Sequence, residues 1–350
     1  MVGAYLAFSY LFLASGVMVS GYVVEHYVAS KRLIIRAGIV CLPLTLMMGW
    51  VESVELLVPL TSLLWFLGGM AFSALNSLAS DLTPSESRGA YFSLLAMASP
   101  LGAIVGGLIS GPIVDQWNYQ ALFIVMTGVS LLWPLSIWLL DTTPLTSASV
   151  VSNLPVSGTA SLGDKHHRLS TNTKLLLFAS LLAFIANFIG ILGVSLSMDE
   201  LGFNATEISS TAVIGGLVAL PFIYGIGRLS DLLGRKLFWI TCCVSGLVAL
   251  WALPVANNLW HFWCVALLLR IFSTGNRGIG SAWVVDLSNG INSPKLIALF
   301  GTTTWVGGIL GYLITGYGLL YWGGGITFSL ALTFPLLAIL FVIPLNAKRK

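Results

Sequence analysis

Two arginines stand inside one of the most apolar parts of the chain, near residues 259–282. Arg270 and Arg277 are seven residues apart, so on a helix they share one face with Ser273 and Thr274. A guanidinium is permanently charged and carries five N–H donors, which suits an anionic or strongly polar small molecule. A structural alternative stays open, in which Arg270 donates to carbonyls of neighbouring helices and Arg277 extends to the inner membrane interface.

Several uncharged polar side chains also stand in apolar stretches. They are Asn76, Asn187 and Tyr224, and the run from Thr302 to Trp305. Each is a candidate for the same cavity as Arg270, Arg277 and Thr274, and each could instead hydrogen-bond a neighbouring helix. No Asp or Glu stands in the middle of an apolar stretch, so no carboxylate that could carry a proton is visible there.

No metal or cofactor is predicted from the remaining reactive residues. The four cysteines all fall in apolar stretches and lack the spacing of metal ligands. His166 and His167 lie in a hydrophilic stretch, where a solvated segment is favoured over a metal site. No nucleophile and base stand at matched depth, and no nucleotide-binding loop is present, so neither an enzyme nor direct use of ATP is expected.

The elements that must position these residues are membrane helices. The chain is 57% hydrophobic and only 8% charged, whereas a soluble domain carries about 25% charged residues. Its apolar stretches are apolar on every side, which favours helices over barrel strands. Eleven spans are predicted, near residues 3–24, 33–51, 56–78, 90–112, 120–140, 174–197, 209–228, 237–256, 259–282, 297–318 and 324–345.

The basic residues predict the orientation of these spans. With the N-terminus outside, every Lys and Arg except Arg270 and Arg277 falls in a cytoplasmic segment, and the C-terminus is cytoplasmic. The net charge of +3 then reflects topology and not a nucleic-acid surface. A multi-pass protein of the plasma or inner membrane is expected, with the lipid bilayer as its surroundings.

The chain repeats itself at an offset of about 205 residues. Gly21 and Glu25 correspond to Gly227 and Asp231, and Asp81 corresponds to Asp286. Two similar helical bundles are therefore predicted, at 1–140 and 174–350. The stretch 141–173 is rich in Ser, Thr, Pro and Asn, which predicts a flexible cytoplasmic linker between them.

The two predicted bundles are unequal, because five spans precede the linker and six follow it. Subtracting the offset from the span near 174–197 gives positions before residue 1, so the unmatched helix is the first of the N-terminal bundle. A shortened chain, a start assigned too late and a working eleven-span protein are the alternatives. The first two are favoured, since losing one helix leaves the packing of one bundle incomplete.

The strongest motif is the run Gly227-Arg228-Leu229-Ser230-Asp231-Leu232-Leu233-Gly234-Arg235-Lys236, expected in a short cytoplasmic turn after the seventh span. It resembles the G-x-x-x-D-x-x-G-R-K signature of the major facilitator superfamily. A degenerate copy runs from Gly21 to Glu25 and is followed by Lys31-Arg32, and a further family-like piece runs from Asp81 to Arg88. The resemblance covers nearly the whole chain and implies an all-α fold of two helical bundles.

The resemblance also implies a conformational latch on the cytoplasmic side. In such a latch Asp231 meets the N-terminal end of the fourth span, near Gly89 to Ser93, and Arg235 pairs with Asp81. The latch residues would be Gly21, Glu25, Asp81, Arg88, Gly227, Asp231, Gly234, Arg235 and Lys236. The alternative is that the basic residues only set the topology, which leaves the fixed spacing to Asp231 unexplained.

Glycines recur every four or five residues in the fourth and tenth spans. They are Gly102, Gly106, Gly107, Gly111, Gly307, Gly311 and Gly316. Close helix packing is favoured over solute contact for this set. The run from Gly107 to Pro112 also resembles part of the antiporter signature of drug exporters in the superfamily, although Asp115-Gln116 replaces the glycine pair that normally follows.

The resemblance implies a secondary transporter that works by alternating access. It also places the helix of Arg270 and Arg277 along a central cavity. The expected partner is a small organic solute, with an anionic one as candidate, and a monomer is expected. The competing hypothesis is a transport-inactive membrane sensor or assembly protein on the same scaffold.

Overall fold

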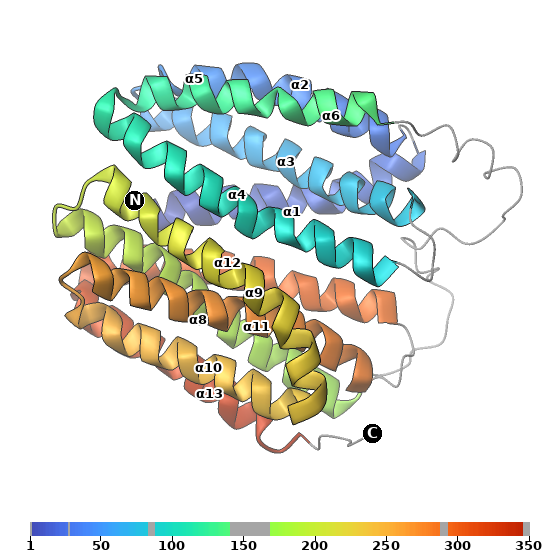
Figure 1. The fold of residues 1–350 in the computed structure, drawn as a ribbon, viewed down its shortest axis with the longest axis vertical. Helices are drawn as coiled ribbons and strands as arrows, with labels where there is room; N and C mark the ends of the chain where they lie inside the picture. Colours follow the sequence, from blue (N-terminus) through green and yellow to red (C-terminus); the bar gives the residue numbers. More distant parts are fainter. Residues whose placement is uncertain (1, 27–28, 83–87, 141–168, 288–292, 346–350) are drawn as a thin grey trace, which may run out of the picture. The chain divides into compact units, whose positions relative to one another are not determined.

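The computed structural model describes residues 2–26, 29–82, 88–140, 169–287 and 293–345, apart from a few side chains within helices (Figure 1). These residues form helices and no strand, which confirms the predicted all-α class. The helices are α1 (Val2–His26), α2 (Ser30–Met48), α3 (Val54–Leu82), α4 (Arg88–Gln116), α5 (Tyr119–Ser130), α6 (Leu132–Leu139), α8 (Thr171–Glu200), α9 (Ala205–Leu233), α10 (Arg235–Ala252), the 3-10 turn η1 (Leu253–Val255), α11 (Leu259–Leu287), α12 (Ser293–Ala331) and α13 (Thr333–Val342). Most of the predicted linker lies outside the described residues.

The described helices accommodate the eleven predicted spans. Eight helical windows are long and apolar enough to cross a membrane, and the last of them, Leu296–Val342, has 47 residues, enough for two crossings. Its break is at Gly323, where φ is +74° inside α12. The basic helix α2 and the arginine-bearing helix α11 supply the other two spans.

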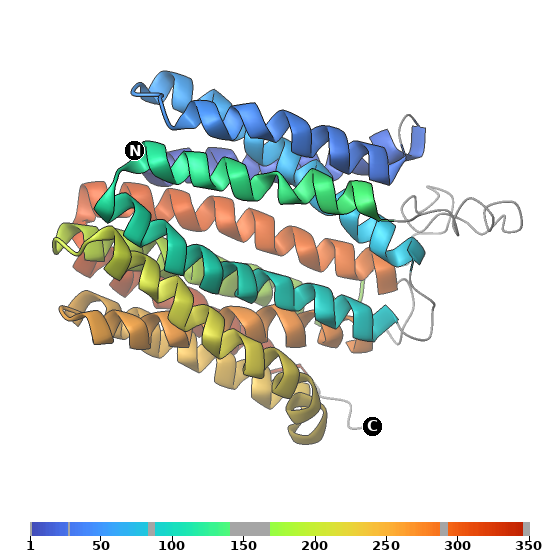
Figure 2. The same cartoon turned by 45° about the horizontal axis from the view of Figure 1, so that its top comes forward.

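Two spans are interrupted by proline. Pro134 has no N–H to donate to the carbonyl of Ser130, and α5 ends at that residue before α6 begins. The two helices follow one line, as the green ribbon of Figure 2 shows. Pro335 has the same relation to Ala331, where α12 gives way to α13. Both interruptions are therefore local. Helices α5 and α6 together serve as one membrane crossing, and so do α13 and the part of α12 that follows Gly323.

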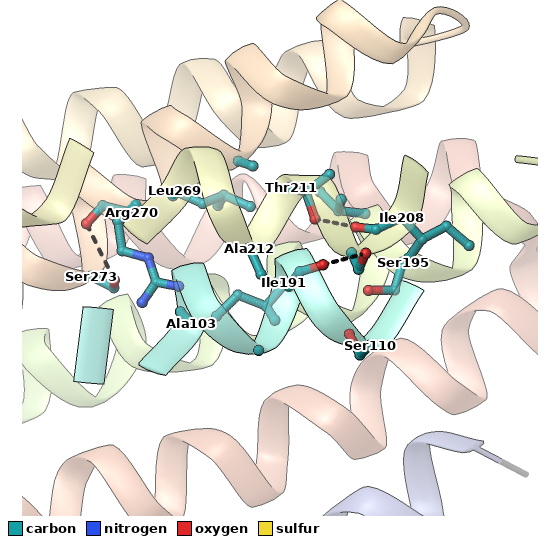
Figure 3. A pocket seen from close by; sticks show the side chains of 16 residues that line it. Ala103, Ser110, Ile191, Ser195, Ile208, Thr211, Ala212, Leu269, Arg270 and Ser273 are labelled. Carbon is teal, nitrogen blue, oxygen red and sulfur yellow. Dashed lines mark hydrogen bonds between the residues drawn. The ribbon is translucent and has the colours of Figure 1, made fainter. Parts of the chain in front are cut away.

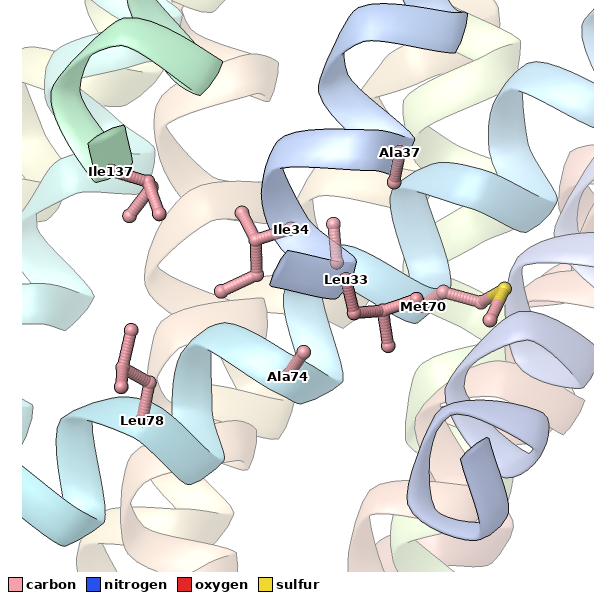
Figure 4. Close-up of a cluster of buried hydrophobic side chains, with 8 residues drawn as sticks. Leu33, Ile34, Ala37, Met70, Ala74, Leu78 and Ile137 are labelled. Atoms are coloured by element: carbon pink, nitrogen blue, oxygen red, sulfur yellow. The ribbon is translucent and has the colours of Figure 1, made fainter. Parts of the chain in front are cut away.

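Contacts divide the described residues into two compact units. Unit 2 comprises Phe8–Ala96 and Ile113–Ala160, and unit 1 comprises Met1–Ala7, Met97–Pro112 and Ser161–Lys350. The core of unit 2 joins α2, α3 and α6 (Figure 4). Its buried side chains are Leu33, Ile34, Ala37, Met70, Ala71, Ala74, Leu78 and Ile137.

Unit 1 is built around α8, which is buried on most of its circumference and packs against α11, α12 and α13. A helix that is apolar all round fits such a central position. Helix α12 approaches α8 closely at two glycines. A Cβ built at Gly307 would lie 2.6 Å from Phe184 Cβ, and one at Gly311 would lie 2.8 Å from the Ile185 carbonyl oxygen.

The sequence repeat reappears as a repeated hydrogen bond, once in each unit. In unit 2, Lys31 Nζ donates to the carbonyl of Leu140, just past the end of α6. In unit 1, Lys236 Nζ donates to the carbonyl of Leu345 at 3.0 Å, just past α13. Both lysines and both acceptors are 205 positions apart. A lysine at this place satisfies carbonyls that a helix end leaves unpaired.

We expect the Lys236→Met substitution to lower the free energy of unfolding by about 1 kcal/mol, because it removes a charged donor from a helix end. Thermal unfolding of the purified protein measures this as a lower midpoint. Adding Lys31→Met should lower the midpoint further, since the two bonds lie in separate units. The exposed Lys174→Met is the control. Equal midpoints for Lys236→Met and the control would contradict this role.

Candidate functional site

The motif from Gly227 to Lys236 is mostly helical. Helix α9 continues to Leu233, and the chain turns only at Gly234, where φ is +92°. The expectation of a turn over the whole motif is wrong, because the helix continues through every motif residue before Gly234. A positive φ suits glycine, and it allows α10 to begin at the next residue.

Arg235 forms an ion pair inside unit 1. Its Nε lies 2.9 Å from Asp286 Oδ2 on α11, and both side chains are partly exposed. An exposed pair of this kind contributes about 0–1 kcal/mol. Asp286 is the repeat counterpart of Asp81, the partner predicted for Arg235.

The predicted latch stays a prediction. The side chains of Glu25, Asp81, Arg88 and Asp231 lie outside the described residues, and so does Gly227 beyond its place in α9. Gly21 lies on α1, and a Cβ built there meets no described atom within 4 Å.

The two arginines of α11 have different surroundings. Arg270 is partly buried and lines a pocket, whereas Arg277 is exposed and does not line it. Thr274 does not line this pocket either, although the adjacent Ser273 does. Sharing a helical face was therefore not enough to bring both guanidinium groups to one site.

Asn187 and Asn76 are not among the residues that line this pocket. Asn187 on α8 is buried, and its Oδ1 has no hydrogen-bond partner among the described residues. Asn76 Nδ2 donates to the carbonyl of Phe72 in its own helix at 2.9 Å. Tyr224 lies on α9 with its side chain outside the described residues.

The pocket belongs to unit 1 and has a volume of about 450 Å³. Four helices supply its walls: α8, α9, α11 and the segment of α4 that clusters with unit 1 (Figure 3). The lining residues are Ala103, Gly106, Gly107, Ser110, Ile191, Val194, Ser195, Ile208, Ser209, Thr211, Ala212, Gly215, Ala266, Leu269, Arg270 and Ser273.

Small residues hold α4 against α9 at one wall of the pocket. A Cβ built at Gly107 would lie 2.7 Å from the Ser209 carbonyl oxygen, and one at Gly111 would lie 2.5 Å from Thr206 Cα. Ser209 Oγ also donates to the carbonyl of Gly107 at 2.9 Å. This close contact is the kind that small residues permit between membrane helices.

The packing role predicted for the glycines is confirmed at five positions. Gly107 and Gly111 pack on α9, Gly307 and Gly311 pack on α8, and Gly316 packs on Gly3 of α1. The role does not extend to Gly102 and Gly106, where a built Cβ meets no described atom within 4 Å. Gly106 instead lines the pocket and contributes to its open space.

Other contacts fix α9 beside the pocket. The helix begins with a capping box, in which Glu207 N donates to Asn204 Oδ1 at 2.8 Å and Asn204 N donates to Glu207 Oε2 at 2.9 Å. Trp263 Nε1 on α11 donates to Ser210 Oγ at 2.7 Å. These bonds fix the start of α9 and its distance from α11.

Arg270 provides the charge of the pocket. Its guanidinium passes Gly215 of α9, where a built Cβ would lie 3.2 Å from Arg270 Nε. Within the part of the chain that the structure describes, this guanidinium has no hydrogen bond or ion pair, and none of the lining residues is Asp or Glu. A partly buried cation without a counter-charge is costly unless a ligand or water satisfies it.

Sequence reasoning missed four hydroxyl-bearing residues and a glycine that line the pocket together with Arg270. They are Ser110, Ser195, Ser209, Thr211 and Gly215. Serine, threonine and glycine are common wherever membrane helices pack closely, so these residues carry no distinct signal in one sequence. Arg270 was found because a charge within an apolar stretch is rare.

Comparison with known proteins agrees with this architecture. The sequence model of the Major Facilitator Superfamily matches residues 1–193 and again residues 176–350, once over each copy of the repeat. A relative named Sugar efflux transporter A, from Dickeya chrysanthemi, is 24% identical over 316 residues, which cover 86% of this chain and 77% of the relative. The chain therefore belongs to the Major Facilitator Superfamily, whose members are membrane transport proteins.

Proposed function

We propose that this protein is a secondary transporter of a small hydrophilic organic solute and that the pocket at Arg270 binds this solute. The observation that carries the proposal is a cavity of about 450 Å³ lined by hydroxyl groups and by a guanidinium without a described partner. Its volume lies within the roughly 300–1,000 Å³ of small-molecule sites. Sugars are the first solutes to test, because a relative is named as a sugar efflux transporter.

The mechanism we propose is alternating access. The bundles predicted at 1–140 and 174–350 would move against each other, so that the pocket opens to one side of the membrane at a time. Asp231 and its neighbours in the motif would stabilise one of the two states, in which the pocket is open to one side of the membrane and closed to the other. This model takes the chain as a monomer in the inner membrane, with its N-terminus outside.

Reconstitution into liposomes tests the proposal. Proteoliposomes should take up or release a labelled sugar or sugar derivative faster than protein-free liposomes, with saturable kinetics. Repeating the measurement with an imposed pH gradient tests the proton as coupling ion. If solutes bind to the purified protein but none crosses the membrane, a sensor on a transporter scaffold is the better description.

A further inference from the structure

Five hydroxyl groups line the pocket, and three of them already donate to backbone carbonyls. The single proton of Ser209 lies within reach of two carbonyls, Gly107 at 2.9 Å and Thr206 at 3.1 Å, and Thr211 donates to the carbonyl of Ile208 at 2.7 Å. A hydroxyl group has one proton and two lone pairs, so a hydroxyl that donates to the backbone can only accept from a ligand. Ser273 behaves in the same way, since it donates to the carbonyl of Arg270 at 3.3 Å.

The donor of the pocket is Arg270, which can donate but never accept. Figure 3 places Arg270 and Ser273 at one end of the pocket and Thr211, Ser195 and Ser110 toward the other. The pocket thus has a cationic end that donates and a neutral end where Thr211 accepts and where Ser110 and Ser195 can accept or donate. A complementary ligand has an anionic group at one end and hydroxyl donors along the rest.

The balance of charge sets how many negative groups this ligand carries. One guanidinium lines the pocket, and none of its described lining residues is acidic. A single carboxylate neutralises this charge and can accept two N–H bonds from the guanidinium fork. A phosphate ester carries nearly two negative charges, so part of its charge would stay uncompensated in a partly buried site.

We infer that the solute is a polyhydroxylated monocarboxylate, that is, a sugar acid, whose carboxylate pairs with Arg270 and whose hydroxyl groups donate to Ser209 and Thr211. This inference rests on the proposed transport function and narrows its solute class. A neutral sugar would leave the guanidinium without a counter-charge. The acidic group therefore distinguishes this solute from a plain sugar.

The test compares three ligands that share one sugar framework: glucose, glucuronate and glucose 6-phosphate. Binding to the purified full-length protein and flux in proteoliposomes are both measured. We expect glucuronate to bind at least roughly tenfold more tightly than glucose, because a charge-assisted bidentate pair is stronger than a neutral hydrogen bond. Glucose 6-phosphate should bind more weakly than glucuronate.

Variants of Arg270 connect this preference to the pocket. Arg270→Gln should weaken glucuronate binding roughly tenfold to hundredfold and change glucose binding by less than about threefold. Arg270→Lys keeps the charge but loses the planar guanidinium group. Its affinity for glucuronate should therefore lie between those of the parent protein and Arg270→Gln. Arg277→Gln is the matched control, because Arg277 is exposed on the same helix and away from the pocket. Monodisperse elution of each variant shows that it is folded.

The outcomes separate the inference from the proposed function. The sugar-acid assignment is overturned if glucose and glucuronate are transported equally, or if Arg270→Gln loses affinity for both to the same extent. In either case the proposed transport function is unaffected. Tightest binding by glucose 6-phosphate overturns the single-charge argument. If another small hydrophilic solute crosses the membrane but no sugar acid does, the inference fails and the proposed function stands. If no small hydrophilic solute crosses, the proposed function fails, and the inference fails with it.

Discussion

Replacing Gly215 with leucine should lower the rate of solute transport at least about 100-fold while the protein stays folded. Gly215 lies on α9 at the pocket wall, and a Cβ there would lie 3.2 Å from Arg270 Nε and 3.6 Å from Arg270 Nη2. A leucine side chain would fill part of the cavity and displace the guanidinium. Initial flux rates in proteoliposomes, compared at equal protein, measure the effect.

Gly225→Leu is the matched control for this substitution. Gly225 lies on the same helix, and a Cβ built there meets no described atom within 4 Å. The control should transport within about twofold of the parent, since surface substitutions away from special features usually change little. The transport rate of Gly215→Ala should lie between those of Gly215→Leu and Gly225→Leu. The flexible end of Arg270 can move by about a few tenths of an ångström to make room for one methyl group. Normal transport by Gly215→Leu would show that solute does not use this pocket.

Much of the fold could be predicted from the apolar composition of the chain and from its repeat at an offset of about 205 residues. The eleven apolar stretches predict helices because a membrane leaves the backbone few other ways to satisfy its polar groups. Helix ends were predicted less well. Helix α9 continues through the motif to Leu233, although its apolar run ends near residue 228, because polar residues outside the membrane can still extend a helix.

The candidate site was predicted only at Arg270 and the nearby Ser273 on the same helix. Arg270 stands out in the sequence, but Arg277 is equally unusual there and lies outside the pocket. Which of the two faces a cavity depends on α4, α8 and α9, and those neighbours are distant in sequence. The ion pair between Arg235 and Asp286 was missed for the same reason. The two residues are 51 positions apart in the sequence, and only the packing of α10 against α11 brings them together.

Gly307→Leu should prevent formation of a stable folded protein. A Cβ at Gly307 would lie 2.6 Å from Phe184 Cβ and 3.2 Å from Ile185 N, so the larger side chain would force α12 away from α8. Phe184 is fully buried in the central helix of unit 1 and has no open space into which it can move. Overpacking of this kind costs about 1–3 kcal/mol and more where backbones meet. The yield of monodisperse protein after size-exclusion chromatography measures the loss.

Gly301→Leu separates this packing effect from the general cost of changing a glycine in α12. Gly301 lies less than two helical turns earlier, and a Cβ there meets no described atom within 4 Å. Removing a helical glycine also gains about 1 kcal/mol of helix propensity in either variant. Only the contact with α8 differs, so the control should be recovered at the parent yield. Equal recovery of both variants would mean that α12 does not need its close approach to α8, and that the glycines of this helix serve something other than packing.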